Sequence, residues 1–168
     1  MATQMSDKFK FSDADKAFIS KAEQYCAANE QCRSAVKEKL LAWGADRILA
    51  GHIVDYLVDN DFINEARYCR LYCDSKLRLQ KWGRIKINYM LRSKQIDTKT
   101  ISSALQGLDT DLYRETLVQL AESKLRTIDE DNPLKRKAKL TSYLASHGFE
   151  ASEIQDALTQ FEMGDSQD

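Results

Sequence analysis

Hydrophobic side chains recur along this chain at the spacing of an α-helix. In residues 111–128 the recurring positions are Leu112, Leu117, Leu120, Ala121, Leu125 and Ile128. Most of them fall on one face of a helix with 3.6 residues per turn. The same period predicts helices over about 13–28 and 64–80. Six glycines and one proline among 168 residues also favour helices, because sheets need turn residues at regular intervals.

The pattern of apolar positions repeats with an offset of 53 residues. Moved by this offset, residues 85–105 fall on residues 138–158, and Leu91 coincides with Leu144. A weaker third copy lies upstream of both. A unit of ~50 residues buries little surface alone, so neighbouring units should stack. We therefore predict an all-α protein of three tandem three-helix repeats that form an elongated, curved array.

The repeats give the expected domain boundaries. We place the three repeats at 13–61, 62–109 and 110–162, and expect disordered ends at 1–12 and 163–168. No apolar run reaches the ~18 residues that a membrane span needs, and the first residues lack the apolar stretch of a secretory signal. A location in the cytoplasm is therefore expected.

Charge is distributed unevenly along the chain. Residues 62–105 contain ten Lys or Arg and three acids, a surplus of seven positive charges in a chain whose net charge is −1. A surplus of this size predicts a surface that binds a polyanion such as nucleic acid. With few acids nearby, we expect i,i+4 ion pairs to occupy few of these cations. The alternative is a solvated helix face.

The candidate binding residues are the basic side chains of this stretch and of a second, shorter basic block that begins at residue 134. The first group is Lys76, Arg78, Lys81, Arg84, Lys86, Arg92 and Lys94, and the second is Lys135, Arg136 and Lys139. For the second group a simple solvated helix start is an equal alternative. Reversing the charges of Lys81, Arg84 and Lys86 together is expected to abolish binding without unfolding the protein.

Aromatic residues in the basic stretch have two interpretations. Trp82 could stack on a nucleic-acid base or fill the joint between two helices, and the second is favoured because large aromatics at such turns are mostly core. The same choice applies to Tyr68, Tyr72 and Tyr89.

No residue pattern in the chain indicates catalysis, a metal or a cofactor. A phosphate-binding glycine loop and a nucleophile elbow are both absent from the sequence. The cysteines Cys26, Cys32, Cys69 and Cys73 do not have zinc-ligand spacing. We expect them to be reduced core residues in a protein that is not an enzyme.

Three motifs in the second repeat resemble the RecX family of regulatory proteins. Residues 58–68 are similar to the family's linker, and within it Phe62, Ile63, Glu65 and Tyr68 stand at the family's apolar, acidic and aromatic positions. Lys81-Trp82-Gly83 matches a basic-Trp-Gly turn, and residues 91–96 resemble a helix end. Gln95 replaces the family's glycine there, which argues against a left-handed helix ending.

The resemblance implies a fold of three-helix repeats without catalytic activity. It also implies modulation of the RecA recombinase in DNA repair, recombination and the SOS response. Family members bind in the groove of the RecA–single-stranded DNA filament and block its extension or its ATP hydrolysis. The expected partners are the RecA filament and single-stranded DNA, with double-stranded DNA left open, and the protein is expected to act as a monomer. The alternative function is a helical scaffold that binds only proteins.

Overall fold

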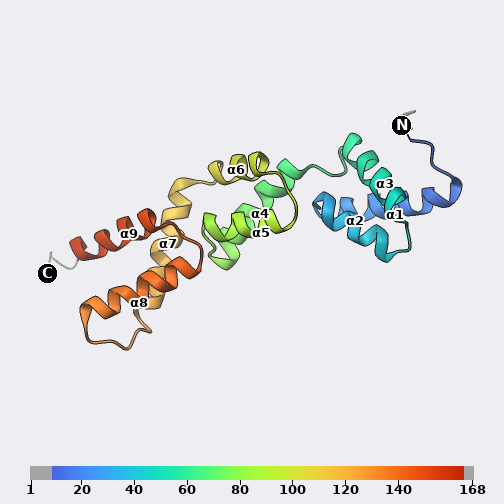
Figure 1. Cartoon of the computed structure of the whole chain (residues 1–168). Coiled ribbons are helices and arrows are strands. Elements are labelled where there is room, and N and C mark those ends of the chain that lie inside the picture. Colours follow the sequence, from blue (N-terminus) through green and yellow to red (C-terminus); the bar gives the residue numbers. More distant parts are fainter. Residues whose placement is uncertain (1–8, 165–168) are drawn as a thin grey trace. The chain divides into compact units, whose positions relative to one another are not determined.

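The computed structural model describes residues 9–164, with side chains to residue 161. Within this range it contains nine α-helices and no strand, which confirms the all-α class (Figure 1). The helix expected at 13–28 is found there, and those expected at 64–80 and 111–128 begin or end within three residues of the prediction. The helices are α1 (Asp13–Ala28), α2 (Arg33–Ala42), α3 (Arg47–Asp59), α4 (Glu65–Gln80), α5 (Arg84–Ser93), α6 (Thr98–Gln106), α7 (Thr110–Leu125), α8 (Pro133–Ser146) and α9 (Ala151–Gly164).

The described chain divides into two compact units. The first contains the described residues up to Tyr68 together with Lys94–Ile96, and the second contains Cys69–Ser93 and the described residues from Asp97 onward. The division falls inside α4. The three repeat boundaries and the curved array stay predictions.

The first unit is built on a core shared by α1, α2 and α3. Leu40, Ile53 and Leu57 are fully buried in it, and Ile63 is almost so. A hydrogen bond in each direction between Ser12 and Asp15 caps the start of α1 and leaves few free N–H groups in its first turn.

The ends of the chain differ in part from the expected disorder. Residues 1–8 and 165–168 lie outside the described residues. Phe9 and Phe11, in contrast, pack against the core of the first unit, and α9 runs to Gly164. The ends expected to be disordered, 1–12 and 163–168, therefore include residues 9–12 and 163–164, which the structure describes.

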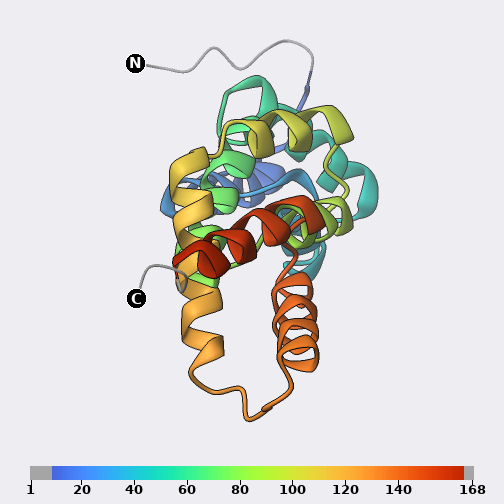
Figure 2. The same ribbon diagram turned by 90° about the vertical axis from the view of Figure 1, so that its left-hand side faces the viewer.

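The second unit joins the α5–α6 pair to the three helices α7, α8 and α9. Tyr113, Leu117, Leu144 and Phe149 are buried between these last three helices. Figure 2 shows α7 and α8 joined at one end by the loop of residues 126–132, with α9 crossing both. Asn132 caps α8 by accepting hydrogen bonds from two backbone N–H groups of its first turn.

Three helix ends take a left-handed backbone at the same place in the repeat. Gly44 has φ 102°, Gln95 has φ 62° and Gly148 has φ 89°. The offset of 53 residues brings Gln95 onto Gly148, so the local geometry follows the sequence repeat. The expectation that Gln95 argues against this ending was wrong. A side chain there adopts the left-handed conformation at a cost of about 1–3 kcal/mol.

Within the second unit, the turn before α5 and the turn before α9 meet backbone to backbone. The Gly83 N–H donates to the His147 carbonyl at 2.8 Å, and the Ile85 N–H donates to the Gly148 carbonyl at 2.9 Å. A Cβ on Gly83 would lie 2.4 Å from the Gly148 carbonyl carbon, and one on Gly148 would lie 2.3 Å from Lys86 Cβ. Neither position has room for a side chain.

Gly83→Ala is expected to destabilise the second unit by about 3 kcal/mol, because the added methyl group must push apart two backbone segments. The measurement is the free energy of unfolding from urea titration followed by circular dichroism. Gly107→Ala is the matched control, since a Cβ there would meet its nearest atoms at an ordinary 3.5 Å. Equal stability of the two variants would contradict the backbone contact.

Candidate nucleic-acid interface

The turn between α4 and α5 gathers cations around one aromatic ring. The Lys76 Nζ, near the end of α4, lies 4.9 Å from the centre of the Trp82 ring, and the Lys86 Nζ, in the first turn of α5, lies 4.6 Å from it. An ammonium group at this distance is attracted to the electron-rich ring face. We call Lys76, Lys81, Trp82 and Lys86 the tryptophan turn.

Trp82 is half-buried and positions the two lysines. Its backbone N–H donates to the Lys76 carbonyl at 3.2 Å, so the ring and the lysine are fixed by the same turn. This agrees with a packing role for the ring, whereas stacking on a base stays a prediction.

Lys81 stands at a strained helix end. It follows the last residue of α4 with φ 55°, and its N–H donates to the Leu77 carbonyl at 3.2 Å. Glycine is the usual residue at such a left-handed cap because it lacks Cβ. The Lys81 carbonyl accepts a hydrogen bond from His147 Nδ1 at 3.1 Å, which holds the turn in place.

Arg84 is part of the packing of the second unit and not of an open basic surface. Its guanidinium carbon lies 3.8 Å from the centre of the Tyr113 ring, and its Nη1 lies 3.2 Å from Glu150 Oε1. The Arg84 backbone N–H donates to the Tyr113 hydroxyl, which in turn donates to Glu150. Both the charge and the planar face of the Arg84 guanidinium are therefore already engaged, and binding of a phosphate by Arg84 stays a prediction.

The Tyr113 hydroxyl at the centre of this network stays protonated. Burial, and then the hydrogen bond to the Glu150 carboxylate, raise the pKa of Tyr113. A neutral hydroxyl can donate to Glu150 and accept from Arg84 at once. Reversing the charge of Arg84 would place a second carboxylate against Glu150. The triple charge reversal that includes Arg84 therefore carries a cost in stability, and the expectation that it leaves the protein folded stays a prediction.

Arg78 forms an i,i+4 ion pair, although few such pairs were expected in a stretch with so few acids. Its Nε lies 2.9 Å from both carboxylate oxygens of Asp74, one helical turn earlier. Both side chains are about half exposed, so the pair contributes little to stability. The pair nevertheless engages one of the ten basic side chains of residues 62–105, and Asp74 is one of the three acids already counted there.

Arg92 and Lys94 fall in different compact units of the described chain. Arg92 is exposed on α5, seven positions after Ile85. Lys94 belongs to the first compact unit, where its backbone carbonyl accepts a hydrogen bond from the Ser34 hydroxyl at 2.7 Å.

The second basic group does not form one surface. An Arg136 Nη2 donates to the Leu125 carbonyl at the end of α7, and Lys139 Nζ lies 3.2 Å from Glu130 Oε2. A hydrogen bond from the Asn132 backbone and the contact with Lys139 lower the pKa of Glu130. Among the described residues, the Lys135 side chain alone of this group is exposed and makes no ion pair or hydrogen bond. Two of the three cations thus fasten the loop between α7 and α8.

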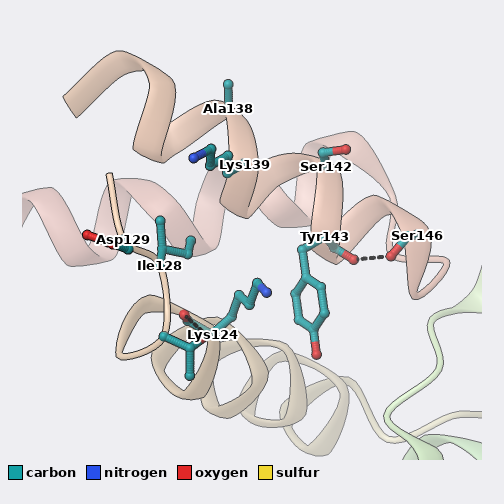
Figure 3. A pocket seen from close by; sticks show the side chains of 9 residues that line it. Lys124, Ile128, Asp129, Ala138, Lys139, Ser142, Tyr143 and Ser146 are labelled. Carbon is teal, nitrogen blue, oxygen red and sulfur yellow. Dashed lines mark hydrogen bonds between the residues drawn. The ribbon is translucent and has the colours of Figure 1, made fainter. Parts of the chain in front are cut away.

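A groove of about 680 Å³ lies between α7 and α8. Lys124 from α7 and Tyr143 from α8 lie side by side in it, with the Lys124 Nζ 4.6 Å from the ring centre (Figure 3). Lys139 and Asp129 complete a lining of mixed charge. Sequence reasoning missed Lys124 because it stands in an acidic stretch. The Asp129 carboxylate makes the groove a poorer anion site than the tryptophan turn.

The cysteines are core residues, as expected. All four are buried and form no disulfide within the described chain. Burial raises the pKa of Cys26 to about 11 and that of Cys73 to about 12, so both thiols are protonated and unreactive at neutral pH. Across the described part of the chain, no three His, Cys, Asp or Glu side chains come close enough to hold a metal ion. No helix in that same part is long and apolar enough to span a membrane.

Comparison with known proteins identifies the family. The sequence models of the second and third three-helix domains of RecX match residues 64–105 and 111–158. The regulatory protein RecX of Acinetobacter baylyi is 31% identical over 133 residues, which cover 79% of this chain and 80% of that protein. The chain belongs to the RecX family. The RecX family consists of regulatory proteins and not of enzymes.

Other RecX proteins differ from this chain in length. The regulatory protein RecX of Clostridium tetani is 32% identical over 127 residues, which cover 74% of this chain but 58% of that protein. The chain therefore spans little more than half of this relative. The crystal structure of RecX from Lactobacillus salivarius has the same fold, with a TM-score of 0.82 at 23% identity over 91% of this chain and 99% of that one.

The RecX motif residues that the structure describes have structural roles. Ile63 is buried in the core of the first unit and Phe62 packs against it. The Glu65 carboxylate accepts a hydrogen bond from the Arg33 backbone N–H at 3.0 Å, at the start of α2. Tyr68 is half-buried. Phe62, Ile63 and Glu65 thus take part in the packing and hydrogen bonding of the first unit.

Lys81→Gly is expected to raise the free energy of unfolding by about 0.5–1 kcal/mol while weakening binding to single-stranded DNA. The gain follows from relief of the left-handed strain, less the added freedom of the unfolded chain. Gln95→Gly is the control, because it relieves the same strain without loss of charge and should leave DNA affinity unchanged. Urea titration and fluorescence anisotropy with a labelled oligonucleotide measure the two quantities. Lower stability in Lys81→Gly would refute the strain at this cap.

Arg84→Ala and Lys86→Ala are expected to have opposite effects. Arg84→Ala should lower the free energy of unfolding by about 2 kcal/mol through the lost bond to Glu150 and the lost stacking on Tyr113. The DNA affinity of the folded fraction should hardly change.

Lys86→Ala should leave stability within about 0.5 kcal/mol of the parent and weaken DNA binding about fivefold. The same two assays separate the effects, and a larger affinity loss in Arg84→Ala would restore Arg84 to the interface.

Proposed function

We propose that this RecX-family chain regulates the RecA recombinase by binding the RecA–single-stranded DNA filament and inhibiting its ATP hydrolysis. The tryptophan turn is the part that contacts nucleic-acid phosphates. The proposal rests on family membership for the partner and on the geometry of Lys76, Lys81 and Lys86 for the contact. It includes action as a monomer in the cytoplasm during DNA repair and recombination, with single-stranded DNA as the nucleic acid and double-stranded DNA left open.

The proposed phosphate contact is supported by one observation. Lys76 and Lys86 are held at the Trp82 ring without a carboxylate partner among the described residues. Within the described side chains, no ion pair engages Lys76, Lys81 or Lys86. The nearby carboxylates of Asp74 and Glu150 are used by Arg78 and Arg84. Ammonium groups without acidic partners are free to replace the counterions of a phosphate backbone, and the release of those ions drives binding.

The remaining candidate cations have a smaller share in the proposal. Arg92 and Lys135 are exposed and can add charge at a distance. The ion pairs of Arg78 and Lys139 must open before either residue can bind a phosphate. We also retain the three repeats at 13–61, 62–109 and 110–162 as a proposal, supported by the RecX domain matches at 64–105 and 111–158.

The alternative is a RecX-fold scaffold that binds protein without touching nucleic acid. Salt distinguishes the two, because each phosphate contact to a single strand adds about 0.7 to the slope of log affinity against log salt. Three lysines would therefore contribute a slope of about two. Docking through apolar surfaces alone would show almost no slope between ~50 and ~200 mM salt.

The double variant Lys76→Gln with Lys86→Gln is expected to weaken inhibition of RecA ATP hydrolysis on single-stranded DNA on the order of tenfold. The salt slope for bare oligonucleotide should fall by about 1.4. The assay follows phosphate release from RecA filaments titrated with the protein at several salt concentrations.

The matched control is Lys99→Gln with Arg126→Gln, which removes the same charge from exposed positions elsewhere in the second unit. It should behave like the parent protein. Equal losses in the two double variants would show that net charge alone drives binding. Inhibition of RecA without any salt slope would favour the protein-only scaffold.

A further inference from the structure

Exposed hydrophobic side chains are frequent in the stretch of sequence that contains the tryptophan turn. Of the seven large hydrophobic residues exposed in the described chain, four fall between residues 71 and 89. They are Leu71, Leu79, Ile85 and Tyr89. Single exposed hydrophobics are normal on a protein surface, but clustered ones mark interaction sites.

Two of these side chains share one face of α5. Ile85 is 56% exposed and Tyr89, one turn later, is 72% exposed. Arg92 follows at the next turn, so the three residues line one stripe at positions i, i+4 and i+7. Ile87 and Leu91 lie on the opposite side of α5, fully buried where α5 packs on α6. The stripe of Ile85, Tyr89 and Arg92 is called the α5 stripe below.

The neighbouring helix shows what an ordinary solvated face of this unit looks like. On α6 the exposed residues are all polar, namely Thr98, Lys99, Ser102, Ser103 and Gln106. Its apolar residues Ile101 and Ala104 are buried. The apolar exposure of α5 is therefore not shared by α6, the helix on which it packs.

The charge around the α5 stripe defines the partner that fits it. Helix α5 reads RIKINYMLRS and contains no acid. Arg84 is engaged by Glu150, so Lys86 and Arg92 supply the basic border. Tyr and Arg are enriched among the residues that contribute most of the binding energy in protein interfaces. Here they lie beside the aliphatic side chain of Ile85. The complementary surface is an apolar patch of a protein, bordered by carboxylates.

We infer that the α5 stripe docks on an acidic-bordered apolar surface of a protein, separately from the phosphate contacts of the tryptophan turn. The inference rests on the proposed function, since the protein is then the RecA protomer of the filament. Ile85 has neither a polar atom nor an aromatic face, so it gains nothing from a phosphate backbone and much from burial against apolar side chains. One turn of chain thus carries two kinds of contact: lysines for nucleic acid and the α5 stripe for protein.

The test is the double variant Ile85→Gln with Tyr89→Gln, which leaves net charge unchanged. The concentration that half-inhibits RecA ATP hydrolysis on single-stranded DNA should rise at least about thirtyfold. Binding to the bare oligonucleotide should change less than about twofold. Leu134→Gln is the matched control, because Leu134 is 79% exposed on α8 of the same unit; it should change neither quantity. If the double variant does not fold, Tyr89→Gln alone should still weaken inhibition at least about fivefold.

Three outcomes overturn the inference while the wild-type protein still inhibits RecA. They are full inhibition by the double variant, an equal loss of bare DNA binding, which would assign Tyr89 to base stacking, and a wild-type dimer that the variant dissociates. If the wild-type protein neither inhibits nor binds RecA filaments, the proposed function fails and this docking assignment fails with it. The activity of the wild type therefore tells the two failures apart.

Discussion

The backbone contact between the turns at Gly83 and Gly148 is the constraint on which the second unit depends. Two N–H groups of one turn donate to two carbonyls of the other, and neither glycine has room for a methyl group. Hydrogen bonds between main-chain atoms leave no side chain to adjust, so the two turns have a single relative position. Helices α5 and α9 start from these turns, and the packing of Tyr113 and Phe149 follows from where they start.

The same contact explains why neighbouring basic residues have different surroundings. Arg84 begins α5 directly beside the joined turns, and there its charge meets Glu150 and its plane meets the Tyr113 ring. Lys76 and Lys86 lie around Trp82 and keep their ammonium groups free of acids within the described chain. Neighbouring cations in one sequence motif thus have different surroundings: Arg84 is engaged in packing, and Lys76 and Lys86 are the ones that our proposal assigns to binding.

The sequence predicted the fold better than it predicted the site, for physical reasons. Helical period and the offset of 53 residues are local properties, so they located the helices and brought Gln95 onto Gly148. The pair of Arg84 and Glu150 joins residues 66 positions apart, and no local pattern shows it. Arg78 and Asp74 are four positions apart, so their ion pair could have been predicted from the sequence. It was not predicted, because the large surplus of bases made few such pairs expected. Lys124 was missed because its neighbours in the sequence are acidic, whereas its neighbours in space are Tyr143 and Lys139.

The joined turns also have a consequence for the order in which the molecule matures on the ribosome. The N–H groups of Gly83 and Ile85 find their acceptors at residues 147 and 148, more than sixty positions later in the chain. Until those residues leave the exit tunnel, the nascent chain lacks the two hydrogen bonds that join this segment to the turn before α9. The segment that carries the tryptophan turn is therefore anchored to the turn before α9 only after residues 147 and 148 have been synthesised.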